Sequence, residues 1–368
     1  MKRITYILLL ITTLVSTLIT AQENSADYLN KSWKEVATKM PMDWYSTQEA
    51  AGVAENILIA QKEIGGWKKN KPYHHTFSKL EKEHYVKDKS AIGATFDNDA
   101  TITELRFLAK MYANKKDPRY KAAFERGLNY IFIAQYANGG WPQFFPVRTG
   151  NTSYSAHITY NDNAMVNTMK FLKEIYTNDK EFAALNLTNQ YKTKAKNAFN
   201  NGINCILKTQ IIVQGKPTVW CAQHDEITLA PANARSYELA SFSGGESVGI
   251  VLLLMDLENP SKEIINAING AIEWFKDHKI EGIKLDTEIQ DDGRKNRIVV
   301  KDENAPTLWG RFYDLDTEKP YFSDRDGIKK NTFAEMGYDR RNGYAWYTNA
   351  PEKALEKYEE WKLKFTNN

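Results

Sequence analysis

Residues Ala94–Tyr112 read ATFDNDATITELRFLAKMY, and they decide the fold because a polar cluster is followed at once by an amphipathic helix. The cluster is Asp97-Asn98-Asp99, and apolar residues from Ile102 to Tyr112 then recur at helical spacing. One side-chain oxygen suffices to cap a helix, so three in a row leave oxygen atoms to spare. Taken alone, this segment fits an over-provided helix cap as well as it fits a cation site.

A second copy of the pattern favours the cation site. Residues Thr159–Tyr176 read TYNDNAMVNTMKFLKEIY, in which Asn161, Asp162 and Asn163 again open a helical stretch. If the two helices begin side by side, their carboxylate and amide oxygens form a site for a hard cation.

A glutamine marks a longer repeat. Gln61, Gln135 and Gln210 each end a helical segment, at separations of 74 and 75 residues. The first two are followed by Gly-Gly-Trp, with Trp67 and Trp141. A period of this length with two helices per unit is typical of an α-hairpin array, stacked or circular. Each Trp is either a packing wedge between hairpins or a platform for a sugar ring.

Residues 1–21 of the 368-residue chain are predicted to be a secretory signal, with Lys2 and Arg3 before an apolar run. Residues 22–368 are predicted to form a single domain that is secreted or periplasmic. Removing the two basic residues takes the net charge from +3 to +1, which gives no global argument for nucleic acid or membrane binding. Cys205 and Cys221 either pair or remain buried thiols.

Charged residues are concentrated in Trp220–Gly245, just before an apolar stretch, Glu246–Leu257, that we expect to be a buried helix. Arg235 is the residue of most interest there, and the alternative to a catalytic role is an ion pair with Glu238. The other charged residues of this segment are His224, Asp225 and Glu226.

Two further arginines lie in the loop-rich stretch Pro306–Gly327. Arg311 and Arg325 stand among aromatic residues that include Tyr313, and guanidinium groups beside aromatic faces suit an acidic sugar polymer. The alternative is pairing of these arginines with nearby surface carboxylates. Those carboxylates are Asp314, Asp324 and Asp326.

At this point the motifs resemble a known family. ATFDNDAT, AQYANGGWPQFFP, HITYNDNAMV, TVWCAQHDEITLAPANARSYELASFSGGES and TLWGRFYDLDTEKPYFSDRDG are similar, in this order, to the pectate lyases of polysaccharide lyase family 10. The resemblance implies a mainly α (α/α)₃ toroid of helical hairpins with long loops and short β segments. It also implies calcium-dependent β-elimination on polygalacturonate, and we expect a monomer.

The resemblance also implies roles for individual residues. Asp97, Asn98 and Asp162 match calcium-site residues, and Arg235 matches the catalytic arginine. Arg311 and Arg325 match arginines that hold substrate carboxylates, and Trp141 and Tyr313 are further expected substrate contacts. The run Asp97-Asn98-Asp99 departs from the family pattern at Asp99. A free guanidinium is an awkward general base, so His157 and His224 remain alternatives.

Three competing functions are open from the residues alone. A glycoside hydrolase needs two opposed carboxylates, for which Glu226 and Asp162 are candidates. A non-catalytic pectin-binding protein would use the same surface without cleavage. A terpene cyclase shares the Gln-x-x-x-Gly-Gly-Trp repeat, but the signal peptide and the missing Asp-x-Asp-Asp cluster disfavour it.

Overall fold

The computed structural model describes residues 27–365, so the predicted signal peptide lies outside the described residues. These residues form two compact units. Unit 1 contains residues 27–95, 99–131 and 178–188, and unit 2 contains residues 96–98, 132–177 and 189–365. The chain passes between the units several times, so neither unit is one continuous stretch of sequence.

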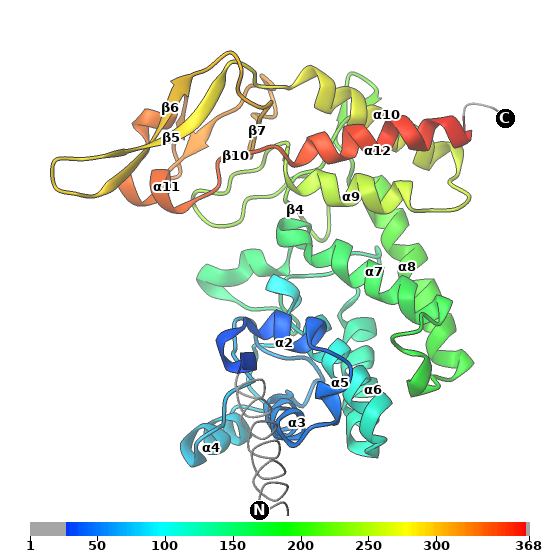
Figure 1. Ribbon diagram of the computed structural model, residues 1–368. Coiled ribbons are helices and arrows are strands. Elements are labelled where there is room, and N and C mark those ends of the chain that lie inside the picture. The colour runs from blue at the N-terminus through cyan, green and yellow to red at the C-terminus, as the bar shows by residue number, and fades with distance from the viewer. Residues whose placement is uncertain (1–26, 366–368) are drawn as a thin grey trace, which may run out of the picture. The chain divides into compact units, whose positions relative to one another are not determined.

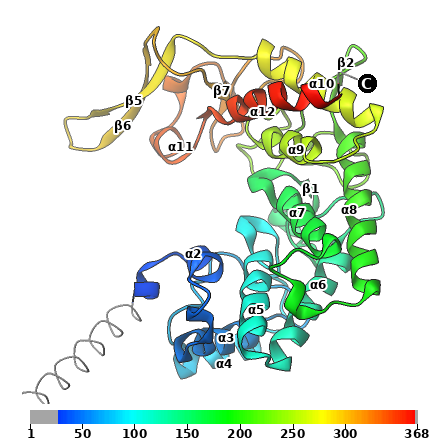
Figure 2. The same cartoon turned by 45° about the vertical axis from the view of Figure 1, so that its right-hand side comes forward.

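Unit 1 is helical. Its helices are α2 (Trp33–Lys39), α3 (Gln48–Ala60), α4 (Lys79–Lys87), α5 (Ile102–Lys115) and most of α6 (Pro118–Ala134), with short 3-10 turns η1 (Asp27–Asn30), η2 (Trp44–Ser46) and η6 (Ala183–Leu185). Helix α3 packs against α4 and α5 (Figures 1 and 2). The side chains of Ser32, Thr47 and Ser78 each accept a backbone N–H at a helix start. These caps satisfy donors that the first helical turn leaves free.

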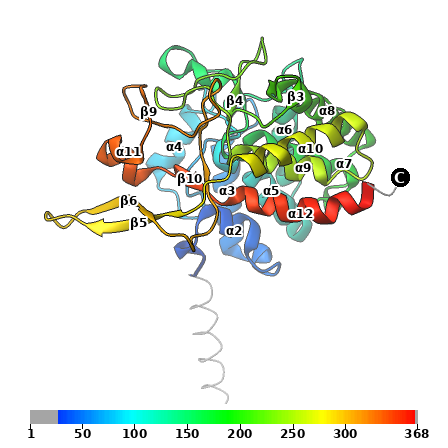
Figure 3. The same ribbon diagram turned by 90° about the horizontal axis from the view of Figure 1, so that it is seen from above.

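Unit 2 contains helices α7 (Ala164–Thr177), α8 (Asn189–Thr209), α9 (Glu246–Met255), α10 (Lys262–Asp277), α11 (Tyr338–Gly343) and α12 (Ala350–Phe365), with 3-10 turns η4 (Gly150–Ala156) and η7 (Phe333–Glu335). Helix α9 is in contact with α7, α10 and α12, and Figure 3 shows it between the last two. Only Gly249 and Leu252 of α9 are not buried. The prediction of a buried helix here is confirmed. Within residues 27–365, no helix is both long and apolar enough to cross a membrane.

The strands form small antiparallel pairs. The pairs are β1 (Ile158–Thr159) with β4 (Gln223–His224), β2 (Ile212–Val213) with β3 (Lys216–Pro217), β5 (Ile283–Ile289) with β6 (Lys295–Lys301), β7 (Trp309–Gly310) with β10 (Tyr347–Thr348), and β8 (Phe322–Ser323) with β9 (Lys329–Lys330). The β5–β6 hairpin is the longest of these pairs, with seven residues in each strand. Most of its side chains are not buried.

The three repeated glutamines have one structural role. Gln61, Gln135 and Gln210 each donate from the amide nitrogen to two backbone carbonyls, over 2.7 to 2.9 Å. One carbonyl belongs to the loop after the glutamine's own helix, and the other belongs to the next long helix of the repeat. The acceptor residues are Gly65 and Ala123, Gly139 and Ala198, and Thr218 and Ala267. Each glutamine thus ties one hairpin to the next.

The tryptophans that follow are also structural. Trp67 and Trp220 are fully buried, and each indole N–H donates to a carbonyl of the preceding helix, Ile57 or Ile206, over 2.9 and 2.8 Å. The backbone N–H of each is 3.0 Å from a hydroxyl near the start of a later helix, Thr101 at α5 in one case and Ser247 at α9 in the other. The same bond therefore recurs in two hairpins.

The loop-rich stretch near the carboxyl end has its own core. Buried Phe312, Tyr321, Phe322, Phe333, Met336 and Trp346 pack together there. Aromatic burial on this scale fixes a segment that has little regular secondary structure. The chain can therefore hold arginine side chains on loops in defined positions.

Candidate active site

The two Asp/Asn clusters form the same unusual turn. In each, the second and third residues have left-handed backbone angles: φ is 53° at Asn98 and 60° at Asp99, and 52° at Asp162 and 58° at Asn163. Such angles are uncommon for residues other than glycine and concentrate at functional sites. In both turns the second residue is exposed and the first is buried. Asn98 and Asp162 therefore occupy equivalent positions, from which their side-chain oxygens are accessible.

A hydrogen-bonded network surrounds the second turn. The Asn161 amide nitrogen donates to Asp162 Oδ2 over 2.7 Å, and its carbonyl Oδ1 accepts from Arg311 Nη2 over 3.0 Å. Arg311 Nη2 also donates to Glu246 Oε1 over 3.1 Å. The backbone N–H of Asp162 bonds to the Glu246 carboxyl group. One candidate metal ligand and one candidate substrate arginine are thus joined through Asn161 and Glu246.

Glu246 is the first residue of α9, and its side chain is almost fully buried. Burial raises the pKa of this carboxyl to about 7, Arg311 opposes the rise, and the negative charge of Asp162 adds to it. The carboxylates of Asp162 and Glu246 are therefore close enough to repel each other. Oxygen donors with excess negative charge fit a hard divalent cation, for which Asp97, Asn98 and Asp162 are the candidate ligands. Asp97 and Asn98 belong to unit 2, as do Asp162 and Glu246.

Arg235 is partly exposed, and in this structure it is paired with Glu238. Its Nε and Nη2 donate to the two carboxylate oxygens of Glu238 over 2.8 and 2.5 Å. These bonds raise the pKa of Arg235 above its already high value. Tyr344 donates its hydroxyl hydrogen to Glu238 Oε1 over 2.9 Å. The ion pair considered as the alternative for Arg235 is thus present, and it holds the guanidinium in the charged form.

Arg325 differs from the other two arginines. Its side chain is exposed, and within residues 27–365 it makes no ion pair. The carboxylates expected to compete for it are engaged elsewhere: Asp314 pairs with Lys329, Asp326 pairs with Lys330, and Asp324 accepts backbone N–H groups. The guanidinium of Arg325 is therefore available to an acidic ligand.

Two expected substrate contacts lie in the core. Trp141 and Tyr313 are each 1% exposed. The Tyr313 hydroxyl donates to His278 O over 2.8 Å and accepts from the Gly310 N–H over 2.9 Å. This corrects the expectation that these rings contact a sugar, because neither presents a face to solvent. Both pack the scaffold instead.

The structure also restricts the alternative bases and acids. His224 is fully buried, with Nε2 accepting from the Cys221 N–H and Nδ1 facing Leu229 O. Both ring nitrogens are occupied and burial lowers the pKa of His224 to about 4, so it is a structural residue. His157 Nδ1 is 2.8 Å from Glu226 Oε2, so Glu226 is engaged in that pair. Possible ligand atoms of His157, Asp225 and Glu226 lie within 4.8 Å of one another.

The two cysteines are free and buried, so the buried-thiol alternative is confirmed. Burial raises the pKa of Cys205 to about 12. Neither thiol contributes a reactive group at neutral pH.

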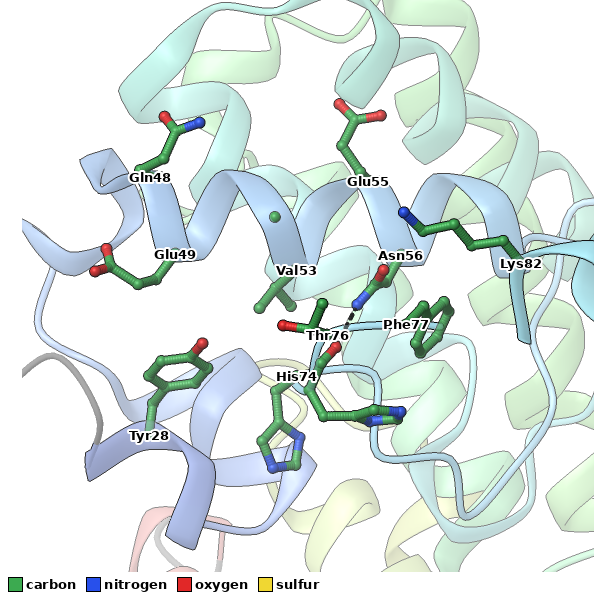
Figure 4. Close-up of a pocket in the computed structure, with 12 residues that line it drawn as sticks. Tyr28, Gln48, Glu49, Val53, Glu55, Asn56, His74, Thr76, Phe77 and Lys82 are labelled. Carbon is green, nitrogen blue, oxygen red and sulfur yellow. Dashed lines mark hydrogen bonds between the residues drawn. The ribbon is translucent and has the colours of Figure 1, made fainter. Parts of the chain in front are cut away.

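A separate pocket lies in unit 1. Its volume is about 440 Å³, and Figure 4 shows part of its lining along α3. Glu49 and Glu55 contribute two carboxylates, while Lys82 contributes one ammonium group. The Asn56 amide bonds to the backbone oxygen of His75 over 2.7 Å. This pocket contains none of the predicted site residues, and its acidic lining does not suit a polyuronate.

Three residues around these arginines were not predicted as functional from the sequence. They are Glu246, Tyr344 and Arg340. In the sequence, Arg340 resembles a surface charge, and Glu246 resembles an ordinary acid in a first helical turn. Glu246 is distinguished only by its position directly after Gly244-Gly245, between the charged segment and an apolar helix.

This chain is similar to proteins of known family and structure. The family model described as pectic acid lyase matches residues 61–355. A solved family 10 polysaccharide lyase from Cellvibrio cellulosa is 32% identical over 92% of this chain and 96% of that one, with a TM-score of 0.74. A mutant of the enzyme from that organism, in complex with trigalacturonic acid, is 32% identical over 87% and 95%, with a TM-score of 0.73. No curated protein matches. The expected fold class, a mainly α (α/α)₃ toroid, is thereby confirmed.

Proposed function

Because this chain belongs to the pectic acid lyase family, we propose that it cleaves α-1,4-linked polygalacturonate by calcium-dependent β-elimination, with Arg235 as the general base. We further propose that the mature protein is a secreted or periplasmic monomer, since residues 1–21 have the pattern of a secretory signal. The solved relative that binds trigalacturonic acid supports this choice of substrate.

One observation carries the proposal: a cation-type turn and a carboxylate-binding arginine share one bonded network. Asp162 is connected to Arg311 through Asn161, over 2.7 and 3.0 Å. A substrate carboxylate placed between Arg311 and a cation bound at Asp162 would contact two positive charges, the guanidinium and the cation. Hydrolysis of a neutral sugar requires an accessible acid with a raised pKa opposite a second carboxylate. Glu246 has a raised pKa, but it is almost fully buried and bonded to Arg311.

The reaction begins at C5, whose hydrogen is weakly acidic because the neighbouring carboxylate is already negative. In the proposed step Arg235 takes the C5 proton, and the C–H electron pair forms a C4=C5 double bond. The C4–O4 bond breaks, and the departing oxygen is protonated from solvent. Arg311 and Arg325 would hold uronate carboxylates by bidentate bonds. The chemistry that Ca²⁺ supplies when bound by Asp97, Asn98 and Asp162 is neutralisation of the carboxylate beside C5.

Arg235 requires a change of state before it can act as a base. Its bonds to Glu238 stabilise the protonated guanidinium, so these bonds must be lost before the guanidinium can take a proton. The Arg235 side chain is 45% exposed and the Glu238 side chain is 11% exposed, so the guanidinium is the more accessible of the two to a substrate. Loss of the ion pair, with other positive groups nearby, favours the neutral form. Alkaline pH acts in the same direction.

The test is incubation of the purified protein with polygalacturonate, with and without Ca²⁺, followed by ultraviolet absorbance of the unsaturated product. We expect absorbance to rise only with Ca²⁺, and a chelator to stop it reversibly. Chain cleavage without the new absorbance would identify a hydrolase instead. Binding without cleavage would identify a pectin-binding protein.

A further inference from the structure

The side chains around Arg235 and Arg311 form a stack in which arginine and tyrosine alternate. The Arg235 Cζ atom lies 4.8 Å from the centre of the Tyr237 ring. The Arg340 Cζ atom lies 3.6 Å from that ring and 3.8 Å from the ring of Tyr344. The Arg311 Cζ atom lies 4.5 Å from the Tyr344 ring. Arg340 is thus the central guanidinium between the two arginines that the proposed reaction uses.

Arg340 is unusual because it is a buried cation without a carboxylate partner. It is 7% exposed, and within residues 27–365 it forms no ion pair. Its Nε and Nη2 atoms have no hydrogen-bond partner in the part of the chain that the structure describes. Its backbone oxygen accepts from the Trp346 indole N–H over 2.8 Å, which fixes the main chain. Burying a charge in this way is costly, and the faces of the two tyrosine rings supply the compensating attraction.

We infer that Arg340 is a positioning residue, whose stack with Tyr237 and Tyr344 holds Arg235 and Arg311 at a fixed spacing. The inference rests on the proposed function, because it assigns a consequence to the spacing of those two arginines. This stack is the frame of the site, and Tyr344 is held in it by the bond from its hydroxyl to Glu238. Planar stacking on two rings requires guanidinium, so lysine cannot replace arginine at this position.

A positioning role and direct substrate binding predict different kinetics. If Arg340 only aligns Arg235 and Arg311, replacing it disturbs the geometry of the reacting groups and lowers kcat more than it raises KM, even though Arg311 also holds a uronate. If Arg340 itself binds a uronate, replacing it chiefly raises KM. The 7% exposure of Arg340 and the rings beside its guanidinium favour the first outcome.

The experiment compares Arg340→Lys and Tyr237→Leu with a matched control, Arg294→Lys. Arg294 also stacks on a tyrosine, Tyr338, at 4.6 Å, but lies in the exposed β5–β6 turn. On polygalacturonate with saturating Ca²⁺, we expect kcat to fall at least about tenfold in the two stack variants, with KM changed by less than about threefold. The control should keep wild-type values of both.

A second measurement does not depend on activity. In selectively labelled protein, the Nε–H resonances of Arg235 and Arg311 should exchange slowly with water, because Arg235 Nε is bonded to Glu238 and Arg311 Nε is buried. Exchange should become fast in Arg340→Lys and in Tyr237→Leu, but not in Arg294→Lys. Unchanged exchange together with a raised KM would overturn the inference. If the wild type does not cleave polygalacturonate, the proposed function fails, and the exchange rates alone decide whether Arg340 positions the other two arginines.

Discussion

Replacing Glu238 with Gln should lower the pH at which the enzyme reaches full activity. The carboxylate bonds Arg235 over 2.8 and 2.5 Å, and it is the main cause of the raised pKa of that guanidinium. Opposite charges about 4 Å apart interact by about 1 kcal/mol in water and about 4 kcal/mol near a protein surface. Because Arg235 is 45% exposed, its interaction energy with Glu238 should lie near the lower of these two values. An energy of about 1.4 kcal/mol corresponds to a change of about one unit in the pKa of Arg235.

The direction of this pH shift depends on which protonation state of Arg235 is stabilised by Glu238. A negative neighbour stabilises the protonated guanidinium, so its removal lets Arg235 lose its proton at lower pH. The other groups around Arg235 are Tyr237 and Tyr344, which this change leaves in place. Glutamine keeps one oxygen acceptor for Tyr344, so the frame should persist.

The assay is the pH profile of kcat/KM on polygalacturonate with saturating Ca²⁺. We expect the alkaline rise of the Glu238→Gln profile to move down by about one pH unit. Asp292→Asn is the matched control, because Asp292 pairs with Arg294 over 2.6 Å on the exposed hairpin. An unchanged profile in Glu238→Gln, or a shift to higher pH, would refute the reasoning that Arg235 must lose this partner to act.

Three further outcomes test other parts of the structure. Arg235→Ala should lower kcat by about 10²–10⁴-fold while calorimetric binding of galacturonate oligomers survives, and wild-type turnover would exclude Arg235 as the base. Gln135→Ala should lower the free energy of unfolding by about 1–3 kcal/mol in urea titrations, because it leaves two inter-hairpin bonds unmade. Glu246→Gln should stabilise the fold above pH 7 by about 2–3 kcal/mol and have no effect below about pH 4.5, as measured by thermal unfolding without added cation. The sign holds because the folded-state pKa of Glu246, about 7, lies above the unfolded value.

The sequence predicts the scaffold well because local patterns encode it. The apolar run of α9 is a local pattern, and each repeated glutamine marks the local end of a helix although the repeats are 74 and 75 residues apart. The structure places both as expected. The site depends on contacts over long separations: Arg311 meets Asn161 across 150 positions and Glu246 across 65. Periodicity indicates which face of a helix is buried, but not which loops meet.

Individual failures have specific physical causes. Trp141 was expected to contact substrate because an indole suits a sugar ring, yet the same ring also suits the gap between two hairpins, and here it is buried. Arg340 could not be found from composition, since a buried guanidinium and a surface guanidinium look alike in one sequence. Its partners Tyr237 and Tyr344 lie more than a hundred residues apart.

Two hairpins share a bond from the backbone N–H of a tryptophan to a hydroxyl at the start of a later helix. This bond aligns the two hairpins residue by residue, with Thr101 equivalent to Ser247. In that register Asn98 and Asp99 correspond to Gly244 and Gly245, and Ala100 corresponds to Glu246. A side chain on Gly244 would meet the Gly310 carbonyl at 2.6 Å. Where the first hairpin has two side chains with oxygen atoms, the later hairpin therefore has two glycines, one packed closely against the Gly310 carbonyl, followed by the acid Glu246.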